Sequence, residues 1–391
     1  MKDFVFQNPA KIIFGKTALE HLVEEVAVYG DRVLLVTGGG SVKRNGIYDQ
    51  VMQRLNRARI TVTELSGVKP NPVLSLVHQG VALCREREVQ LVLALGGGSV
   101  IDTAKAIANG VTYDGDEWDF HAGLATPQRV LPLGTILTLP AAGSEMSYSC
   151  VITNENGMLK RGFNSVTNVP RFSLLNPEFT FTLPPYQTAC GAVDIMAHMM
   201  ERYFTQEKHV ELTDGLIESA LRTVIRNAPI VMEKPDDYDA RSEIMWAGAL
   251  AHNTLLETGR VGDWATHKLE HELSGMFDIA HGAGLAILFP TWMENVMDVG
   301  AEKLSQFAEK VLGVPRDGRT DEAVAREGID RLRAFYRSLG MPLSLREAGI
   351  AQDKAEEMAR KALPNESARL GFFKPIDRPL AERIYHQAME G

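Results

Sequence analysis

The chain has 391 residues, enough for two or three domains of ordinary size. With 45% apolar and 23% charged residues it has the composition of a globular protein, which excludes a disordered or fibrous chain. Its 50 acidic residues outnumber 41 basic ones, and the net charge of −9 argues against a nucleic acid as the main partner. Three scattered cysteines, no apolar run of about 18 residues and no signal peptide predict a soluble cytoplasmic protein.

Short apolar segments and helix-length segments alternate along the first part of the chain. We predict strands at Lys11–Gly15, Val33–Thr37, Thr61–Leu65, Leu91–Leu95, Ile136–Pro140 and Phe172–Asn176. We predict helices at Thr17–Tyr29, Ile47–Ala58, Val73–Arg85 and Val100–Gly110. This alternation favours a mainly parallel sheet with helices on both faces, and uniformly apolar strands are typical of a sheet buried on both sides.

The pattern changes after Leu183-Pro184-Pro185, where amphipathic segments of helical period follow one another. Clusters of β-branched residues become rare there, which argues against a second sheet. We therefore predict an α/β domain at residues 1–185 and an all-helical domain at residues 186–391.

Two predicted strands run directly into triple-glycine turns that end in serine, at Gly38–Ser41 and Gly96–Ser99. Glycines between a strand and a helix let the backbone approach a ligand, and the free N–H groups of a helix start favour an anion. The second turn is the better candidate, because it opens a well-formed helix at the carboxyl end of a buried strand. Neither turn is a G-x-G-x-x-G or P-loop motif, so a simple tight turn remains the alternative.

Asp102 and Lys105 lie three residues apart at the start of the helix after the second turn. One interpretation is an acidic residue favoured by the helix dipole beside a solvated lysine. The other places both side chains at the mouth of a cofactor site, and spacing alone does not decide between them.

Histidines and one aspartate form a pattern typical of a metal site in the predicted helical domain. Asp194 and His198 are four residues apart, as are His267 and His271, so each pair shares a helical face. His281 follows shortly after. Imidazoles with one carboxylate suit Fe²⁺ or Zn²⁺ better than Mg²⁺ or Ca²⁺. Spacing alone nominates both His267 and His271 as ligands.

The same segment, His267–His271, reads HKLEH and fits the H-x-x-E-H signature of inverted zinc peptidases. A zinc peptidase is therefore a rival hypothesis, although it leaves both glycine turns unexplained.

With these motifs assembled, the chain resembles the iron-containing (group III) alcohol dehydrogenases along nearly its whole length. The resemblance is closest to the branch of butanol dehydrogenases and NADPH-dependent aldehyde reductases. Five motifs in this order carry it: GGGSVIDTAK (Gly96–Lys105), TLPAAGSEMS (Thr138–Ser147), LNPEFTFTLPP (Leu175–Pro185), DIMAHMMERY (Asp194–Tyr203) and DWATHKLEHELSGMFDIAHG (Asp263–Gly282).

The resemblance implies an N-terminal dinucleotide-binding α/β domain, an all-α C-terminal metal-binding domain, and an active site between them, the architecture of dehydroquinate synthase. It also implies a homodimer joined through the N-terminal strand region. One divalent ion, Fe²⁺ or Zn²⁺, would be held by Asp194, His198, His267 and His281. His271 then becomes a catalytic non-ligand that relays a proton or orients its neighbours, and the peptidase hypothesis falls.

For the cofactor, the resemblance places the pyrophosphate on Gly97, Gly98 and Ser99, with Asp102 facing the nicotinamide end as a further catalytic candidate. The remaining parts of the dinucleotide would contact Asn71, Thr138, Ser147, Lys160 and Phe179.

One departure from the family concerns the coenzyme. NAD-preferring members carry an aspartate after the second strand, where this chain has Gly39. A carboxylate there would repel the 2′-phosphate of NADP, whereas Gly39 and Ser41 with the nearby Lys43 and Arg44 suit it. We therefore expect NADP(H) to be preferred over NAD(H).

The resemblance predicts an alcohol dehydrogenase or aldehyde reductase that transfers hydride between nicotinamide C4 and a small to medium aldehyde or primary alcohol. Within the same fold the alternative is a lyase similar to dehydroquinate synthase, which binds a metal and NAD without net redox change. A non-catalytic metal or nucleotide carrier is the least specific alternative.

Overall fold

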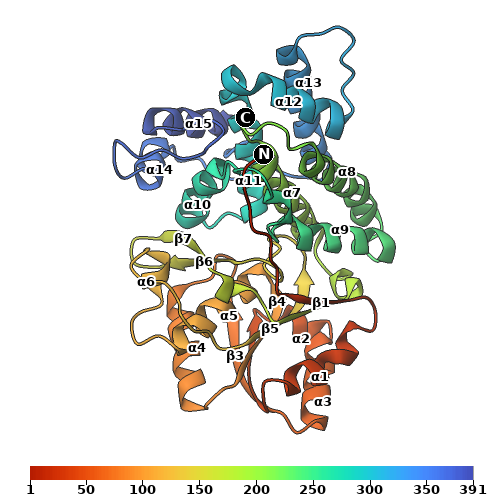
Figure 1. Cartoon of the computed structure of the whole chain (residues 1–391), viewed down its shortest axis with the longest axis vertical. Helices are drawn as coiled ribbons and strands as arrows, with labels where there is room; N and C mark the ends of the chain where they lie inside the picture. Colours follow the sequence, from red (N-terminus) through yellow and green to blue (C-terminus); the bar gives the residue numbers. More distant parts are fainter. Residues whose placement is uncertain (391) are drawn as a thin grey trace. The chain divides into compact units, whose positions relative to one another are not determined.

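A computed structural model describes residues 1–390 and divides the chain into two compact units (Figure 1). The α/β unit comprises Gln7–Leu183 together with Pro235–Asn253. The helical unit comprises Met1–Phe6, Pro184–Lys234 and the described chain from Thr254 onward. A single boundary after residue 185 would place two segments in the wrong unit. Met1–Phe6 packs with the helical unit and Pro235–Asn253 packs with the α/β unit, although each segment adjoins the other unit in sequence.

The α/β unit is built on one six-stranded sheet in which every neighbouring pair of strands is parallel. The strand order is β1-β8-β5-β4-β2-β3. The bounds are β1 Lys11–Phe14, β2 Arg32–Gly38, β3 Thr61–Val68, β4 Leu91–Gly97, β5 Leu133–Leu139 and β8 Phe172–Leu175. All six predicted strands are confirmed, and the central strands β2, β4 and β5 are buried except at their ends, as the uniformly apolar runs indicated.

Helices cover both faces of this sheet. The bounds are η1 Ala18–His21, α1 Leu22–Ala27, α2 Ser41–Arg44, α3 Ile47–Arg57, α4 Leu74–Glu86, α5 Gly98–Val111, α6 Trp118–His121, η2 Val166–Asn168, η3 Pro177–Thr180 and α9 Tyr238–Ala251. Alternate residues of β2 separate the two cores: Leu34 packs with α4 and α5, and Leu35 packs with α1 and α3. Met245 and Ala249 of α9 join the core that contains α4 and α5, which explains why this helix belongs to the α/β unit.

An antiparallel hairpin of β6 (Ser149–Asn154) and β7 (Leu159–Asn164) was not predicted. Its turn contains Asn156-Gly157, with Gly157 at φ +88°, the left-handed conformation that glycine adopts most readily. Asn-Gly between two short segments is a strong hairpin signal, so this element could have been found from the sequence.

The helical unit contains the nine remaining helices of the described chain. Their bounds are α7 Pro185–Tyr203, α8 Glu211–Glu233, η4 Leu255–Glu257, α10 Ala265–Phe277, α11 His281–Asn295, α12 Met297–Leu312, α13 Asp321–Ser338, α14 Ala355–Ala362 and α15 Arg378–Glu390. Helices α7 and α11 are buried along most of their length and form the centre of the unit.

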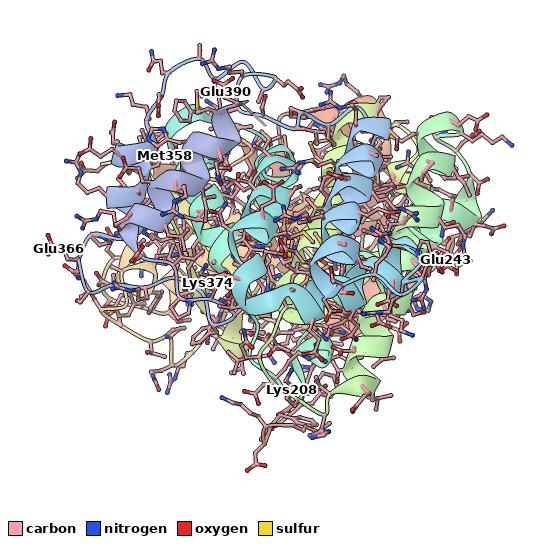
Figure 2. All side chains as sticks on the ribbon, turned by 90° about the horizontal axis from the view of Figure 1, so that it is seen from above. Lys208, Glu243, Met358, Glu366, Lys374 and Glu390 are labelled. Atoms are coloured by element: carbon pink, nitrogen blue, oxygen red, sulfur yellow. The ribbon has the colours of Figure 1, made fainter. Side chains whose placement is uncertain are left out.

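Surface ion pairs tie loops of this unit to its helices, as at Lys374, labelled in Figure 2, whose Nζ lies 2.7 Å from Oδ1 of Asp298 on α12. Within residues 1–390, none of the helices combines the length and apolar character needed to cross a membrane.

Candidate metal centre and cofactor-binding edge

Three helices of the helical unit carry the four residues nominated as metal ligands. Asp194 and His198 lie one turn apart on α7, His267 lies on α10, and His281 is the first residue of α11. These residues are far apart in the sequence, so only the packing of α7, α10 and α11 can bring their side chains together.

The structure brings Asp194, His267 and His281 together, with one potential ligand atom from each lying within 4.8 Å of the others. Oδ1 of Asp194 is 3.9 Å from Nε2 of His267 and 3.8 Å from Nε2 of His281. Asp194 and His267 are buried, and His281 is partly buried.

His198 lies beside this group, although its nitrogens are not within 4.8 Å of all three members. Its Nδ1 is 3.1 Å from Oδ1 of Asp194, and its ring centroid is 4.5 Å from that of His267. His271, which spacing alone nominated, lies outside the group, with its ring centroid 5.9 Å from that of His281. Helical spacing thus placed His267 and His271 on one face but did not identify His281 as the partner of His267.

Each of the three histidines points Nδ1 at an oxygen acceptor. Nδ1 of His198 is 2.9 Å from the backbone oxygen of Asp194. Nδ1 of His267 lies 2.8 Å from Oε1 of Glu201, and Nδ1 of His281 is hydrogen-bonded to Oε2 of Glu270. In this arrangement the nitrogen turned toward Asp194 is Nε2, as seen for His267 and His281.

Glu201 and Glu270 were missed by the sequence analysis. Each lies three residues after one nominated ligand, His198 or His267, yet hydrogen-bonds the next nominated histidine ligand, His267 or His281. Spacing of three or four residues predicts neighbours on the same helix. These two hydrogen bonds instead join α7 to α10 and α10 to α11, so they could not be predicted from spacing.

Two buried carboxylates, Glu201 on α7 and Asp263 just before α10, affect each other electrostatically. Burial raises the pKa of Glu201, and the negative charge of Asp263 raises it further. The peptide N–H groups of His267 and Trp264 act in the opposite direction.

The donor set fits one divalent cation of the first transition row. Two ligand atoms that each lie about 2.1 Å from an ion are at most about 4.2 Å apart, and both Nε2–Oδ1 distances satisfy this limit. Imidazole nitrogens with one carboxylate are typical ligands of Zn²⁺ and Fe²⁺, and each histidine has the outer hydrogen bond that ligating imidazoles usually make.

The residues nominated for the cofactor gather at the carboxyl edge of the sheet in the α/β unit. Gly39 and Ser41 follow β2, Asn71 follows β3, Gly97–Ser99 join β4 to α5, Thr138 is near the end of β5 with Ser147 in the loop beyond it, and Phe179 follows β8. Because all six strands are parallel, their carboxyl ends lie along one edge, where open α/β sheets bind ligands.

The two glycine turns flank the topological switch point of this sheet. They follow β2 and β4, which are neighbours, and the helices after them pack on opposite faces, α3 with one core and α5 with the other. A crevice at such a point is the usual ligand site of this architecture. A Cβ at Gly98 would lie 3.2 Å from Cβ of Ala142, so the second turn packs closely on the segment after β5.

Lys160 on β7 belongs to the same set, because its Nζ donates to Oδ1 of Asn71 over 3.0 Å. Lys160 is buried, and Asn71 has a positive φ of 55°. The unpredicted hairpin thus brings a buried cation to the end of β3.

Asp102 and Lys105 join α5 to the segment after β5 and to the start of β6. Asp102 accepts hydrogen bonds from Ser144 Oγ (2.5 Å) and from the N–H of Val151 (2.9 Å). Lys105 is buried and donates to the backbone oxygens of Ser147 and Ser149 over 2.9 and 2.8 Å.

The interpretation of Lys105 as a solvated residue is therefore wrong. Burial raises the pKa of Asp102 and lowers the pKa of Lys105, and each charge offsets the shift of the other.

Comparison with known proteins gives two family models that together match most of the chain. One is described as iron-containing alcohol dehydrogenase and matches residues 9–177, and the other as the C-terminal part of the Fe-containing alcohol dehydrogenase family, at residues 188–389. The chain is 46% identical to the probable NADH-dependent butanol dehydrogenase 1 of Bacillus subtilis, over 97% of both chains. It is 36% identical to the NADPH-dependent aldehyde reductase YqhD of Escherichia coli, over 99% of this chain and 100% of the reductase.

Among solved structures, the fold is similar to that of NADH-dependent butanol dehydrogenase A from Thermotoga maritima, with a TM-score of 0.95 and 39% sequence identity. The match covers 100% of this chain and 99% of that one.

Proposed function

The chain belongs to the iron-containing alcohol dehydrogenase family, and from this premise we propose that it is a metal-dependent alcohol dehydrogenase or aldehyde reductase. The reaction is hydride transfer between nicotinamide C4 and the carbonyl carbon of a small to medium aldehyde, or the reverse with a primary alcohol. The observation that carries the proposal is the convergence of Asp194, His267 and His281 from three helices.

Asp194, His198, His267 and His281 are the residues that would hold the ion, Fe²⁺ or Zn²⁺. A divalent ion bound there supplies a Lewis acid that polarises the oxygen of a carbonyl or alkoxide. With three neutral imidazoles, the carboxylate of Asp194 reduces the charge of the occupied site from +2 to +1.

His271 is our candidate for moving the proton that the alcohol oxygen exchanges with solvent. It lies one turn after His267 on α10, its ring lies near that of His281, and it is partly exposed. An imidazole titrates near neutral pH, so it suits a proton relay to water. A purely orienting role for the same side chain is the competing hypothesis.

The glycine turn Gly97–Ser99 at the start of α5 is proposed to bind the pyrophosphate through peptide N–H groups, with Asp102 positioning the neighbouring segment after β5. NADP(H) is the proposed coenzyme. Gly39 brings no carboxylate to the β2–α2 turn, and Ser41, Lys43 and Arg44 on α2 supply a hydroxyl and two cations. Nζ of Lys43 also lies 3.3 Å from Oε2 of Glu64 on β3, so this ion pair competes for Lys43, and Arg44 is the cation that has no carboxylate partner among the described residues. The relatives differ in this respect, since the names include both NADH-dependent and NADPH-dependent enzymes.

We also propose a cytoplasmic homodimer. β1 is an edge strand of the sheet, Phe14 on this strand is 39% exposed, and Val5 upstream is 94% exposed. An open strand edge that carries an exposed apolar side chain such as Phe14 favours pairing with another chain. The three cysteines are free thiols, as expected in a reducing compartment.

Consumption of NADPH by the anaerobically purified protein, with a panel of linear aldehydes and metal content measured on the same sample, tests the proposal. We expect aldehyde-dependent oxidation of NADPH that disappears when the metal is stripped and returns with Fe²⁺ or Zn²⁺. A metal-loaded protein that oxidises neither NADPH nor NADH with any aldehyde would contradict it.

A further inference from the structure

The three histidines of the metal centre share one hydrogen-bonding arrangement, but the acceptors differ in kind. His198 donates to a main-chain oxygen, which no substitution removes. His267 and His281 donate to the side chains of Glu201 and Glu270, which are both fully buried. The arrangement of these two histidines therefore depends on two carboxylates that come from other helices.

We propose that Glu201 and Glu270 are positioning residues that hold His267 and His281 in the Nδ1–H tautomer before any metal binds, so that Nε2 faces Asp194. This inference rests on the proposed metal site but concerns the metal-free protein. Which ring nitrogen carries the proton is set by the partner of the other nitrogen, and here both partners are acceptors.

Glu201 serves three donors at once. Its Oε1 accepts from the backbone N–H and from Nδ1 of His267, over 2.9 and 2.8 Å, and its Oε2 accepts from the backbone N–H of Trp264 over 2.5 Å. Trp264 has a positive φ of 63° at the start of α10, so this carboxylate also fixes the entry into the helix. Two of the three partners are peptide N–H groups, which can only donate.

A glutamine therefore does not replace Glu201. If the amide NH₂ faces Trp264, it meets a peptide donor. If the amide NH₂ faces His267 instead, it meets the backbone N–H of His267, which is also a donor. The NH₂ group then donates to Nδ1 of the ring, so that Nδ1 becomes an acceptor and the ring proton moves to Nε2. Either orientation leaves a buried donor without its acceptor.

Glu270 has a different second partner, the hydroxyl of Ser274, which donates to Oε1 and also lies 3.2 Å from the backbone oxygen of Ile279. A hydroxyl both donates and accepts. In Glu270→Gln the amide oxygen still accepts from His281, the NH₂ group donates to Ser274, and the hydroxyl donates to Ile279. Glutamine therefore conserves the tautomer at Glu270 but not at Glu201.

The packing around Glu270 supports a dedicated position for its carboxylate. A Cβ at Gly284 of α11 would lie 2.6 Å from Oε1 and 2.8 Å from Cγ of Glu270. The absence of a side chain at this position admits the carboxylate beside His281.

Nitrogen NMR of histidine-labelled, metal-free protein tests the proposal, because long-range couplings report which ring nitrogen is protonated. Signals are assigned from their loss in His267→Gln and His281→Gln. We expect the Nδ1–H form for both rings in the unmodified protein, retained for His281 in Glu270→Gln, and replaced or mixed with the Nε2–H form in Glu270→Ala and Glu201→Gln. The Nε2–H form in the unmodified protein, or no change in Glu270→Ala, would overturn the proposal.

Metal release to a chelator gives the second readout, with thermal unfolding of each metal-free variant as the control for folding. Loss of an outer hydrogen bond to a ligating histidine weakens metal affinity by roughly 10- to 100-fold, so we expect faster release from Glu201→Gln and Glu270→Ala than from Glu270→Gln. Equal release from the two glutamine variants would contradict the donor argument. If the unmodified chain binds no metal but shows the expected tautomers, the metal function fails while this inference stands.

Discussion

Single side chains determine coenzyme choice in this account, and Gly39 offers a test that the structure permits. A Cβ at Gly39 has no heavy atom within 4 Å, and its φ is not in the left-handed region, so an aspartate fits without strain. We expect Gly39→Asp to lower kcat/KM for NADPH by roughly tenfold or more relative to NADH, because a carboxylate there repels the 2′-phosphate.

Gly215→Asp on the exposed face of α8 is the matched control, since its Cβ also meets nothing within 4 Å and it adds the same charge. Steady-state kinetics with both coenzymes measure the ratio. An unchanged ratio in Gly39→Asp would show that this turn does not contact the adenosine ribose.

The proposed relay predicts a second change at residue scale. His271→Gln keeps the metal ligands, so metal content should equal that of the unmodified protein. Loss of a general acid–base group should lower kcat by roughly 10²- to 10⁴-fold and remove one ionisation from its pH profile. If kcat falls but the pH profile keeps its shape, His271 orients a neighbour and does not carry the proton.

Glu145 gives a prediction about pH and stability. Its carboxyl is fully buried, Oε1 has no hydrogen-bond partner among the described residues, and burial raises its pKa to about 7. Because this pKa is above that of the unfolded chain, the stability it contributes is complete below about pH 4.5 and is lost as pH rises through 7.

We therefore expect the unmodified protein to lose about 2.5 kcal/mol of stability between pH 5 and pH 8 relative to Glu145→Gln. Urea unfolding of both proteins at the two pH values measures the difference. Parallel pH dependences would show that Glu145 is ionised in the folded protein at pH 5.

The sequence indicated candidate residues of the metal centre, but not which of them contact each other across helices. Helical spacing placed His198 beside Asp194 on α7, but the same rule paired His267 with His271. The sequence showed His281 nearby, and only the family resemblance assigned it as a ligand in place of His271. Glu201 was not recognised at all, because its partner lies on another helix and contacts between helices leave no period in a sequence.

At the scale of elements, the six parallel strands and four of the helices follow directly from apolar patterning, because each strand is buried by the helices beside it. The β6–β7 hairpin lacks that pattern: its residues alternate weakly, and Lys160 is a buried cation within it. Its turn carries the Asn156-Gly157 signal, which is a feature of turn residues and not of apolar runs.

Packing of α11 on α7 gives the prediction at this scale. A Cβ at Gly282 would lie 2.1 Å from the backbone oxygen of Cys190 and 2.8 Å from its Cα, atoms that a side-chain rotation cannot move. We expect Gly282→Ala to destabilise the protein by roughly 1–3 kcal/mol and to reduce metal content, because it shifts the helix that begins at His281.

Gly215→Ala within α8 is the control for the same chemical change. Its Cβ meets open space, so replacing a helical glycine should raise stability by roughly 0.5–1 kcal/mol. Chemical denaturation and elemental analysis compare the pair. Equal stability of the two variants would show that the close approach of α11 to α7 is not a constraint.

At the scale of the whole molecule, the sequence shows the domain boundary near Pro184. It does not show that Met1–Phe6 belongs to the helical unit and Pro235–Asn253 to the α/β unit. Helix α9 is less amphipathic than α8 and α10, and what assigns it to the α/β unit is the burial of Met245 and Ala249 against the core of the sheet. Such a choice depends on which surface the helix meets, which composition does not record.

We propose that the helical unit binds one divalent ion at Asp194, His198, His267 and His281. A second group on the α/β unit provides an internal comparison, since Nε2 of His78 lies 3.2 Å from a carboxylate oxygen of both Asp116 and Glu117.

Anomalous diffraction at the absorption edge of the bound metal, from crystals of the anaerobically purified protein, locates every ion in the molecule. We predict one strong peak per chain within coordination distance of Oδ1 of Asp194 and of Nε2 of the three histidines. A peak only at His78, or no peak beside Asp194 in a protein that reduces aldehydes, would contradict the account.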